Sequence, residues 1–268
     1  AGPDVWRRPA IGSDGTEYYE YIMGYLDDLI AVSKNARDVL KEIEDIGGEI
    51  KYKNDQIGPP SDWFGAKLKF RVIDGAGTWV ISSEKYVEAA IKNAEEVCKK
   101  KDKYVLIKSP STPMCTSFMP ELDGSAELDT DETTWYQEFI GVLRWATELG
   151  RVDILYEVSV LSQYSASPRE GHLQQVFHIF AYMKKNPKVS IHMDPTLPEI
   201  NYEVFDMKYE GLEEQYCDAQ EQLPPDMPKP RGVPVTVTAY VDASHATNRV
   251  TRKSHTGFLI FVNQAPIM

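Results

Sequence analysis

The chain has 268 residues, which is enough for one large domain or two small ones. Its content of 42% hydrophobic and 26% charged residues argues against wholesale disorder, and no apolar run approaches the roughly 20 residues of a membrane span. The net charge of −12 argues, taken alone, against a nucleic-acid-binding surface. However, residues 199–228 hold nine acidic residues and one basic residue, whereas residues 229–268 hold five basic residues and one acidic residue. The total charge is therefore a poor guide to partners.

Prolines and glycines punctuate the chain through Gly15, which predicts an irregular start. Apolar residues at 20–25 and 29–32 then predict two strands, and the short connection between them predicts a hairpin. A helical rhythm of apolar residues follows at 39–46, beginning after Ser33 or Asn35 and ended by two glycines. Two further short strands are expected around residues 63–70 and 78–81.

Four helices are predicted between residues 83 and 187. The first follows a cap at Ser82 or Ser83 and ends in a lysine run, and the fourth starts at Ser167-Pro168. Residues 198–232 are acidic and contain four prolines near their end, which is typical of a linker. Strands are expected at 235–242 and 257–262, with no further strand to close this small sheet.

The cysteines and histidines lack the spacing of a known site. Three widely spaced cysteines match neither a disulfide framework nor a zinc pattern, so we expect a reducing compartment and no nucleophilic role: Cys98, Cys115 and Cys217. His172 and His178 lie six residues apart on one predicted helix, which does not place them on the same face. Neither set predicts a metal centre.

Asp27 and Asp28 are the strongest candidates for chemistry. Two adjacent carboxylates at a hairpin repel one another unless they are solvated or joined by a cation. Phosphoryl transfer uses such carboxylates to hold Mg²⁺ ions, and a tight hairpin is a stiff support for them. A hydrated turn is the alternative interpretation, since Asp is an ordinary turn residue.

Two other regions carry candidate polar groups. Asp242 ends an alternating strand on the face opposite the valines, where it either caps a turn or ligates a metal. The basic loop that follows contains Arg252 and Lys253 and either is solvated or approaches phosphates. The run Lys99-Lys100-Lys101-Asp102-Lys103 is expected to be a solvated helix end, with weak contact to a nucleic-acid backbone as the alternative.

Several motifs, in this order, resemble the reverse transcriptase and ribonuclease H region of copia-type LTR retrotransposon polyproteins. Tyr25-Leu26-Asp27-Asp28 resembles the Tyr-x-Asp-Asp palm motif, and Trp63-Phe64-Gly65 resembles the primer grip in a shifted form. The other similar segments are the thumb-like residues 81–87 and 111–114, the connecting-helix residues 136–143, 151–154 and 167–172, and the ribonuclease H-like residues 241–246 and 252–258.

The resemblance implies an α+β fold in four parts: a partial palm with primer-grip-like strands (1–82), a helical thumb and connection (83–197), an acidic linker (198–232) and the truncated start of a ribonuclease H domain (233–268). It implies a nucleotidyltransferase that polymerises DNA on RNA, with Mg²⁺ or Mn²⁺ held by Asp27 and Asp28 and a second metal site begun by Asp242. Weak nucleic-acid contacts would come from Lys99, Lys100, Lys101, Arg252 and Lys253.

The implied partners are an RNA template, a DNA primer, an RNA–DNA hybrid, deoxynucleotide triphosphates and the remainder of the polyprotein. The implied location is intracellular, in a cytoplasmic virus-like particle, the nucleus or both. The family's polymerase also needs an upstream palm Asp, and its ribonuclease H needs later carboxylates, so we expect the isolated chain to be inactive. The alternatives are a non-catalytic remnant that at most binds nucleic acid, and a helical interaction module.

Overall fold

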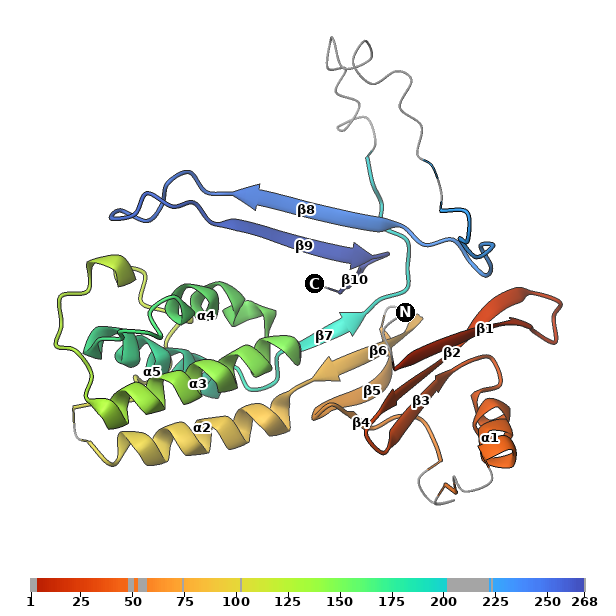
Figure 1. The fold of residues 1–268 in the computed structure, drawn as a ribbon, viewed down its shortest axis with the longest axis horizontal. Coiled ribbons are helices and arrows are strands. Elements are labelled where there is room, and N and C mark those ends of the chain that lie inside the picture. The colour runs from red at the N-terminus through yellow and green to blue at the C-terminus, as the bar shows by residue number, and fades with distance from the viewer. Residues whose placement is uncertain are drawn as a thin grey trace, which may run out of the picture. The chain divides into compact units, whose positions relative to one another are not determined.

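A computed structural model describes residues 4–47, 51–52, 57–73, 75–101, 103–201, 222 and 224–267. The chain divides into two compact units, one formed by residues 1–59 and 197–235 and the other by residues 60–196 and 236–268. The described residues form five α-helices and three small antiparallel sheets, which confirms the predicted α+β class (Figure 1).

This division differs from the boundaries expected from the sequence, because the strands at residues 62–82 fall in the second unit together with the helices. Most of the predicted linker, residues 202–221 and 223, lies outside the described residues.

The first unit contains a three-stranded sheet and one helix. Strands β1 (Val5–Ile11), β2 (Glu17–Tyr25) and β3 (Asp28–Val32) lie in that order, and α1 (Ala36–Gly47) follows β3. The hairpin and helix predicted here are confirmed. The predicted irregular start is wrong, because β1 forms there as an edge strand in which Pro9 pairs opposite Tyr19. An edge strand tolerates proline, since one side of its backbone needs no ladder hydrogen bond.

The buried carboxylate of Glu20 on β2 is hydrogen-bonded to Arg8 on β1 and to Ser33 directly after β3, and Arg8 connects it to α1. Glu20 is 7% exposed and accepts hydrogen bonds from Nε of Arg8, the hydroxyl of Ser33 and the hydroxyl of Tyr18. The two terminal nitrogens of Arg8 donate to the carboxylate of Glu42 on α1, at 2.9 and 2.6 Å. Burial raises the pKa of Glu20, but the hydrogen bonds from Arg8, Ser33 and Tyr18 outweigh it and hold the pKa below its ordinary value.

The second unit begins with a four-stranded sheet in the order β4 (Asp62–Trp63), β5 (Ala66–Ile73), β6 (Ala76–Ser82) and β7 (Ser190–Met193). The single strand predicted at 63–70 is wrong in its first part, because a tight turn at residues 64–65 separates β4 from β5. The strand predicted at 78–81 is confirmed as part of β6. Strand β7 was not predicted; it pairs with β6 across more than 100 residues of intervening chain.

The four predicted helices form as α2 (Glu84–Cys98), α3 (Thr130–Glu148), α4 (Leu155–Ser162) and α5 (Glu170–Lys185). Two short 3₁₀ turns, η2 (Pro120–Leu122) and η3 (Val152–Ile154), precede α3 and α4. The predicted cap at Ser167 is wrong. Arg169 precedes the helix in an extended conformation and bridges to Glu127, and its amide donates to Nδ1 of His172.

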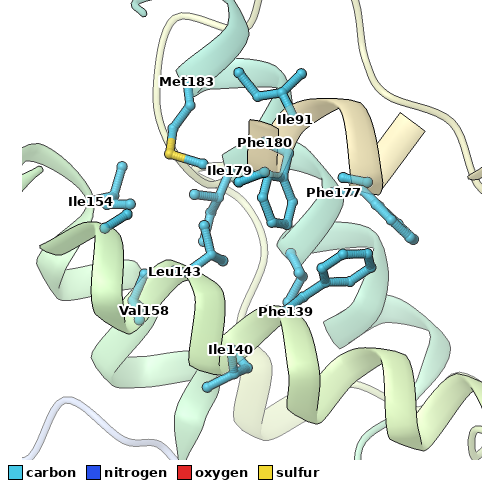
Figure 2. Close-up of a cluster of buried hydrophobic side chains, with 14 of the residues drawn as sticks. Ile91, Phe139, Ile140, Leu143, Ile154, Val158, Phe177, Ile179, Phe180 and Met183 are labelled. Carbon is cyan, nitrogen blue, oxygen red and sulfur yellow. The ribbon is translucent and has the colours of Figure 1, made fainter. Parts of the chain in front are cut away.

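Helices α2, α3, α4 and α5 share one apolar core, shown in part in Figure 2. Its side chains come from the faces that the 3.6-residue rhythm marks, and burying each large one contributes roughly 1.5–3 kcal/mol. The residues labelled in Figure 2 are Ile91 on α2, Phe139, Ile140 and Leu143 on α3, Ile154 and Val158 on η3 and α4, and Phe177, Ile179, Phe180 and Met183 on α5.

The last sheet consists of β8 (Val237–Ala243), β9 (Thr256–Val262) and β10 (Ala265–Pro266) in the order β10-β9-β8. The two strands predicted here are confirmed, and they pair antiparallel. The expectation that no further strand follows is wrong, because a turn in which Asn263 has a φ of 55° brings β10 back onto β9. No helix in the described part of the chain is long and apolar enough to cross a membrane.

Candidate functional site

Asp27 and Asp28 lie at the tip of the β2–β3 hairpin. Tyr25 pairs with Asp28, so only Leu26 and Asp27 connect the strands, and both carboxylates are exposed. Leu26 has a φ of 53°, a left-handed conformation that costs roughly 1–2 kcal/mol in a residue other than glycine. Its side chain is 91% exposed. Strand pairing, rather than packing of Leu26, therefore holds the turn.

The strands behind the tip are closely packed. A Cβ atom added at Gly24 would lie 3.3 Å from both Cδ2 of Leu29 and Cζ3 of Trp6. The amide of Gly24 donates to the carbonyl of Asp4 at 2.9 Å, which extends the β1–β2 pairing to the base of the turn. The hairpin therefore presents its two acids on a supported backbone.

The donor set at the tip fits part of a magnesium site, because Mg²⁺ prefers carboxylate oxygens and keeps several waters. Among the described residues, no group of three or more His, Cys, Asp and Glu side chains is arranged to hold a metal ion. The tip thus offers two adjacent acidic ligands and no third one within the described part of the chain.

Trp63, Phe64 and Gly65 lie in the second unit, at the turn between β4 and β5. Phe64 and Gly65 both have positive φ values, 53° and 85°, which is the pattern of a type I′ hairpin turn with glycine at its second central position. The rings of Trp63 and Phe64 meet edge to face at 5.0 Å. With Trp145 and Leu149 they border a mainly apolar groove of about 290 Å³.

The lysine run after α2 is divided between exposed and paired side chains. Lys99 and Lys100 are exposed, whereas Nζ of Lys101 and Nζ of Lys103 lie 2.9 and 2.7 Å from Oε1 of Glu132. Lys101 also pairs with Asp129. Asp102 lies outside the described residues. Lys101 and Lys103 are therefore held by acidic side chains of the same unit.

Glu132 is a buried residue that the sequence reasoning missed. It is 1% exposed, and its Oε2 accepts a hydrogen bond from the amide of Asp129. In return, Oδ1 of Asp129 accepts a hydrogen bond from the amide of Glu132. The signal was present, because an Asp followed three residues later by Glu at a helix start is a capping box. Burial raises the pKa of Glu132, but hydrogen bonds from Lys103 and Lys101 outweigh it and hold the pKa below its ordinary value.

Asp242 lies near the end of β8, opposite Gly257, and is exposed. Arg252 and Lys253 are exposed in the loop between β8 and β9, and no acidic side chain of the described residues forms an ion pair with them. Within the described residues, therefore, Asp242 has no cluster of acids around it.

The histidines of α5 serve packing. Nε2 of His172 lies 2.9 Å from the carbonyl of Pro120, and Nε2 of His178 lies 3.0 Å from that of Thr112. Burial lowers the pKa of His178. Of the cysteines, burial raises the pKa of Cys98 to about 11, and a hydrogen bond with Ser117 lowers that of Cys115. Cys217 lies outside the described residues.

Two curated proteins are similar to the chain, each at low identity. A putative transposon Ty5-1 protein of Saccharomyces cerevisiae is 24% identical over 226 residues, which cover 82% of this chain and 62% of that protein. A retrovirus-related Pol polyprotein from transposon TNT 1-94 of Nicotiana tabacum is 26% identical over 165 residues, 60% of this chain and 11% of the polyprotein. The chain therefore spans less than two thirds of either relative.

No family model and no solved structure matches the chain. The two curated relatives both derive from transposons, and the match to the first extends over most of the chain. The chain is therefore distantly related to retrotransposon proteins.

Proposed function

We propose that the chain is part of an RNA-directed DNA polymerase with an associated ribonuclease H, encoded by a retrotransposon. The observation that carries this proposal is the pair of exposed carboxylates at the tip of the β2–β3 hairpin, presented by a two-residue turn. The distant similarity to a retrovirus-related Pol polyprotein from a transposon also supports this proposal.

In this function Asp27 and Asp28 would hold Mg²⁺ or Mn²⁺, together with ligands from elsewhere. The ion would neutralise charge that develops on a transferring phosphoryl group. The hairpin would position the two carboxylates, because its base is closely packed at Gly24. Asp242 would begin the acidic set of the ribonuclease H.

The substrates in this proposal are deoxynucleotide triphosphates, an RNA template and a DNA primer, with an RNA–DNA hybrid as the substrate of the ribonuclease H. The turn at Trp63, Phe64 and Gly65 would contact the primer. Exposed lysine and arginine side chains without an ion-pair partner among the described residues are better placed for phosphate contacts than Lys101 and Lys103. Those two lysines would first have to leave Glu132. Among the candidate residues that the structure describes, Lys99, Lys100, Arg252 and Lys253 are exposed and form no ion pair.

Metal binding at the hairpin is the first test. Mn²⁺ added to ¹⁵N-labelled protein should broaden the amide signals of residues 25–29 selectively, because paramagnetic broadening falls steeply with distance. Asp27→Asn and Asp28→Asn should each weaken the broadening. Asp38→Asn, which changes an exposed acid on α1, is the matched control and should leave it unchanged.

The second test is primer extension on an RNA template by the protein that the full open reading frame containing this chain encodes. Wild-type protein should extend the primer with Mg²⁺ present, Asp27→Asn should abolish extension, and Asp38→Asn should retain it. Full activity of Asp27→Asn would contradict the proposal. Mn²⁺ binding at the hairpin without extension by the full reading frame would favour the non-catalytic alternative.

A further inference from the structure

A cavity of about 240 Å³ lies within the second unit, where the loop between β8 and β9 meets α4 and the segment before η2. It is smaller than the roughly 300–1,000 Å³ of pockets for drug-sized ligands, which suits a single small ring system. Three aromatic side chains line it: Phe118, Tyr156 and Tyr164.

The aromatic wall of this cavity is fixed by its neighbours. The ring of Tyr164 stacks on His172 with centroids 4.3 Å apart and an interplanar angle of 27°. Phe118 packs edge-on against the same imidazole at 6.0 Å. Since Pro120 and Arg169 hold both nitrogens of His172, the two lining rings are supported before any ligand arrives.

The loop side of the cavity is fixed by His255. Its Nε2 lies 3.3 Å from Nε2 of Gln163, and its Nδ1 lies 3.2 Å from the hydroxyl of Thr247. Its ring meets Tyr156 edge to face at 6.1 Å. The loop between β8 and β9 is thereby joined to α4, and the cavity lies at this junction.

One carboxylate of the lining has an unused acceptor. Oε1 of Glu121 accepts the amide of Arg249 at 3.1 Å, whereas Oε2 accepts no hydrogen bond from the described residues. The guanidinium of Arg249 likewise forms no ion pair with a described acid, and the exposed Arg252 and Lys253 follow in the same loop. Flat rings, a free acceptor and adjacent cations are thus brought together at one place.

We propose that this cavity binds a nucleobase that carries an exocyclic amino group, with the attached phosphate at the basic loop. Aromatic rings stack on any base, the amino group donates to Oε2 of Glu121, and Arg249 pairs with the phosphate. The base can belong to a free nucleotide or to an unpaired position of a nucleic-acid strand. The proposal rests on the cavity itself and does not require the polymerase activity proposed above.

The test is a titration of ¹⁵N-labelled protein with AMP, CMP, GMP, UMP and ribose 5-phosphate, followed by amide shifts. The three nucleotides with an amino group should shift the amides of residues 118, 119, 121, 163–164 and 247–249, and should bind more tightly than UMP and ribose 5-phosphate. Equal affinity for ribose 5-phosphate and the nucleotides would reduce the site to phosphate binding and overturn the proposal, as would the absence of shifts at millimolar concentration.

Two variants separate the contributions. Tyr156→Ala should weaken the binding of AMP, CMP and GMP about tenfold, as expected for loss of a stacking ring. Leu155→Ala, which changes the preceding exposed residue on α4, should not affect binding. Glu121→Gln keeps an acceptor for the amide of Arg249 but removes the second carboxylate oxygen, so it should lessen the preference over UMP. An unchanged preference would overturn the role of Glu121.

The source of the base is distinguished by comparing AMP with a single-stranded oligoadenylate. Tighter binding of the oligonucleotide, lost in Tyr156→Ala, supports an unpaired base in a strand. Equal binding of both supports a free nucleotide. Tighter oligonucleotide binding that Tyr156→Ala leaves intact would place the strand elsewhere and contradict the proposal.

Discussion

Lys103 and Glu132 form an ion pair at the edge of the helical core, with Nζ 2.7 Å from Oε1. The carboxylate side chain is 2% exposed, whereas the lysine side chain is 41% exposed. The hydroxyl of Tyr104 also donates to Oε1 at 3.2 Å. The charge of Glu132 is thus removed from water but compensated by lysines that themselves reach solvent, which keeps the desolvation penalty moderate.

Replacing Glu132 should destabilise the second unit. Glu132→Gln removes the negative charge that Lys101 and Lys103 share, although its amide oxygen can still accept a hydrogen bond, and we expect a loss of about 1–3 kcal/mol in the free energy of unfolding. Asp131→Asn is the matched control, since Asp131 is an exposed acid in the same first turn of α3. Urea denaturation followed by circular dichroism measures both. Equal stability of the two variants would show that the pair contributes nothing.

The same carboxylates predict how stability depends on pH. The pKa values of Glu132 and Asp129 are lowered in the folded chain, for Asp129 chiefly by the hydrogen bond from Lys101. A lowered folded-state pKa stabilises the fold above the unfolded-state pKa, about 4, and this contribution disappears as pH falls through the folded-state value. Stability should therefore decline below about pH 4–5.

This pH dependence can be assigned to its source by a variant. Glu132→Gln should show a flatter decline than the wild type between pH 5 and pH 3, because its position 132 no longer titrates. Asp131→Asn should follow the wild-type curve. Urea midpoints at each pH provide the measurement, and a steeper decline in Glu132→Gln would reverse the assigned sign.

Arg8 should be important for the first unit, because it connects buried Glu20 with Glu42 on α1. Arg8→Ala leaves Glu20 with only hydroxyl donors, and we expect a loss of about 1–2 kcal/mol, reduced by the partial exposure of the guanidinium. Arg7→Ala, which removes a side chain lying over the ring of Tyr19, is the control and should cost less. Amide hydrogen exchange in α1 should accelerate selectively in Arg8→Ala.

The features predicted from sequence are those that neighbouring residues determine. The hairpin at residues 20–32 and the core face of α5 follow from local periodicity, and both are present. Strand β7 was missed because four polar-and-apolar residues carry little signal until β6 offers them a partner. The start of α5 was misplaced because residues 168–170 join the distant segment 126–128, which competes with local capping.

The candidate sites show the same difference between features set by neighbouring residues and features set by distant contacts. The adjacent acids Asp27 and Asp28 were identifiable because they are consecutive in the sequence and bounded by two apolar strands. The pairing of Lys101 and Lys103 with Glu132, and the meeting of Glu121 with Arg249, join residues about 30 and more than 100 positions apart. Such contacts depend on tertiary packing, which periodicity does not encode.

The strained turn of the β2–β3 hairpin gives a last prediction. Leu26 adopts a φ of 53° with its side chain almost fully exposed, so Leu26→Gly should remove strain without removing a packing contact. We expect the free energy of unfolding to rise by up to about 1 kcal/mol, since the greater freedom of glycine in the unfolded chain offsets part of the gain.

The reverse substitution serves as its control. Gly15, in the β1–β2 turn, has a φ of 78° and open space where a Cβ would lie, so Gly15→Ala isolates the backbone cost. It should destabilise the first unit by about 1 kcal/mol. If Leu26→Gly instead lowers stability, the turn is not strained. If it raises stability but abolishes Mn²⁺ broadening at residues 25–29, the strain at Leu26 is what holds the two carboxylates in their ligating arrangement.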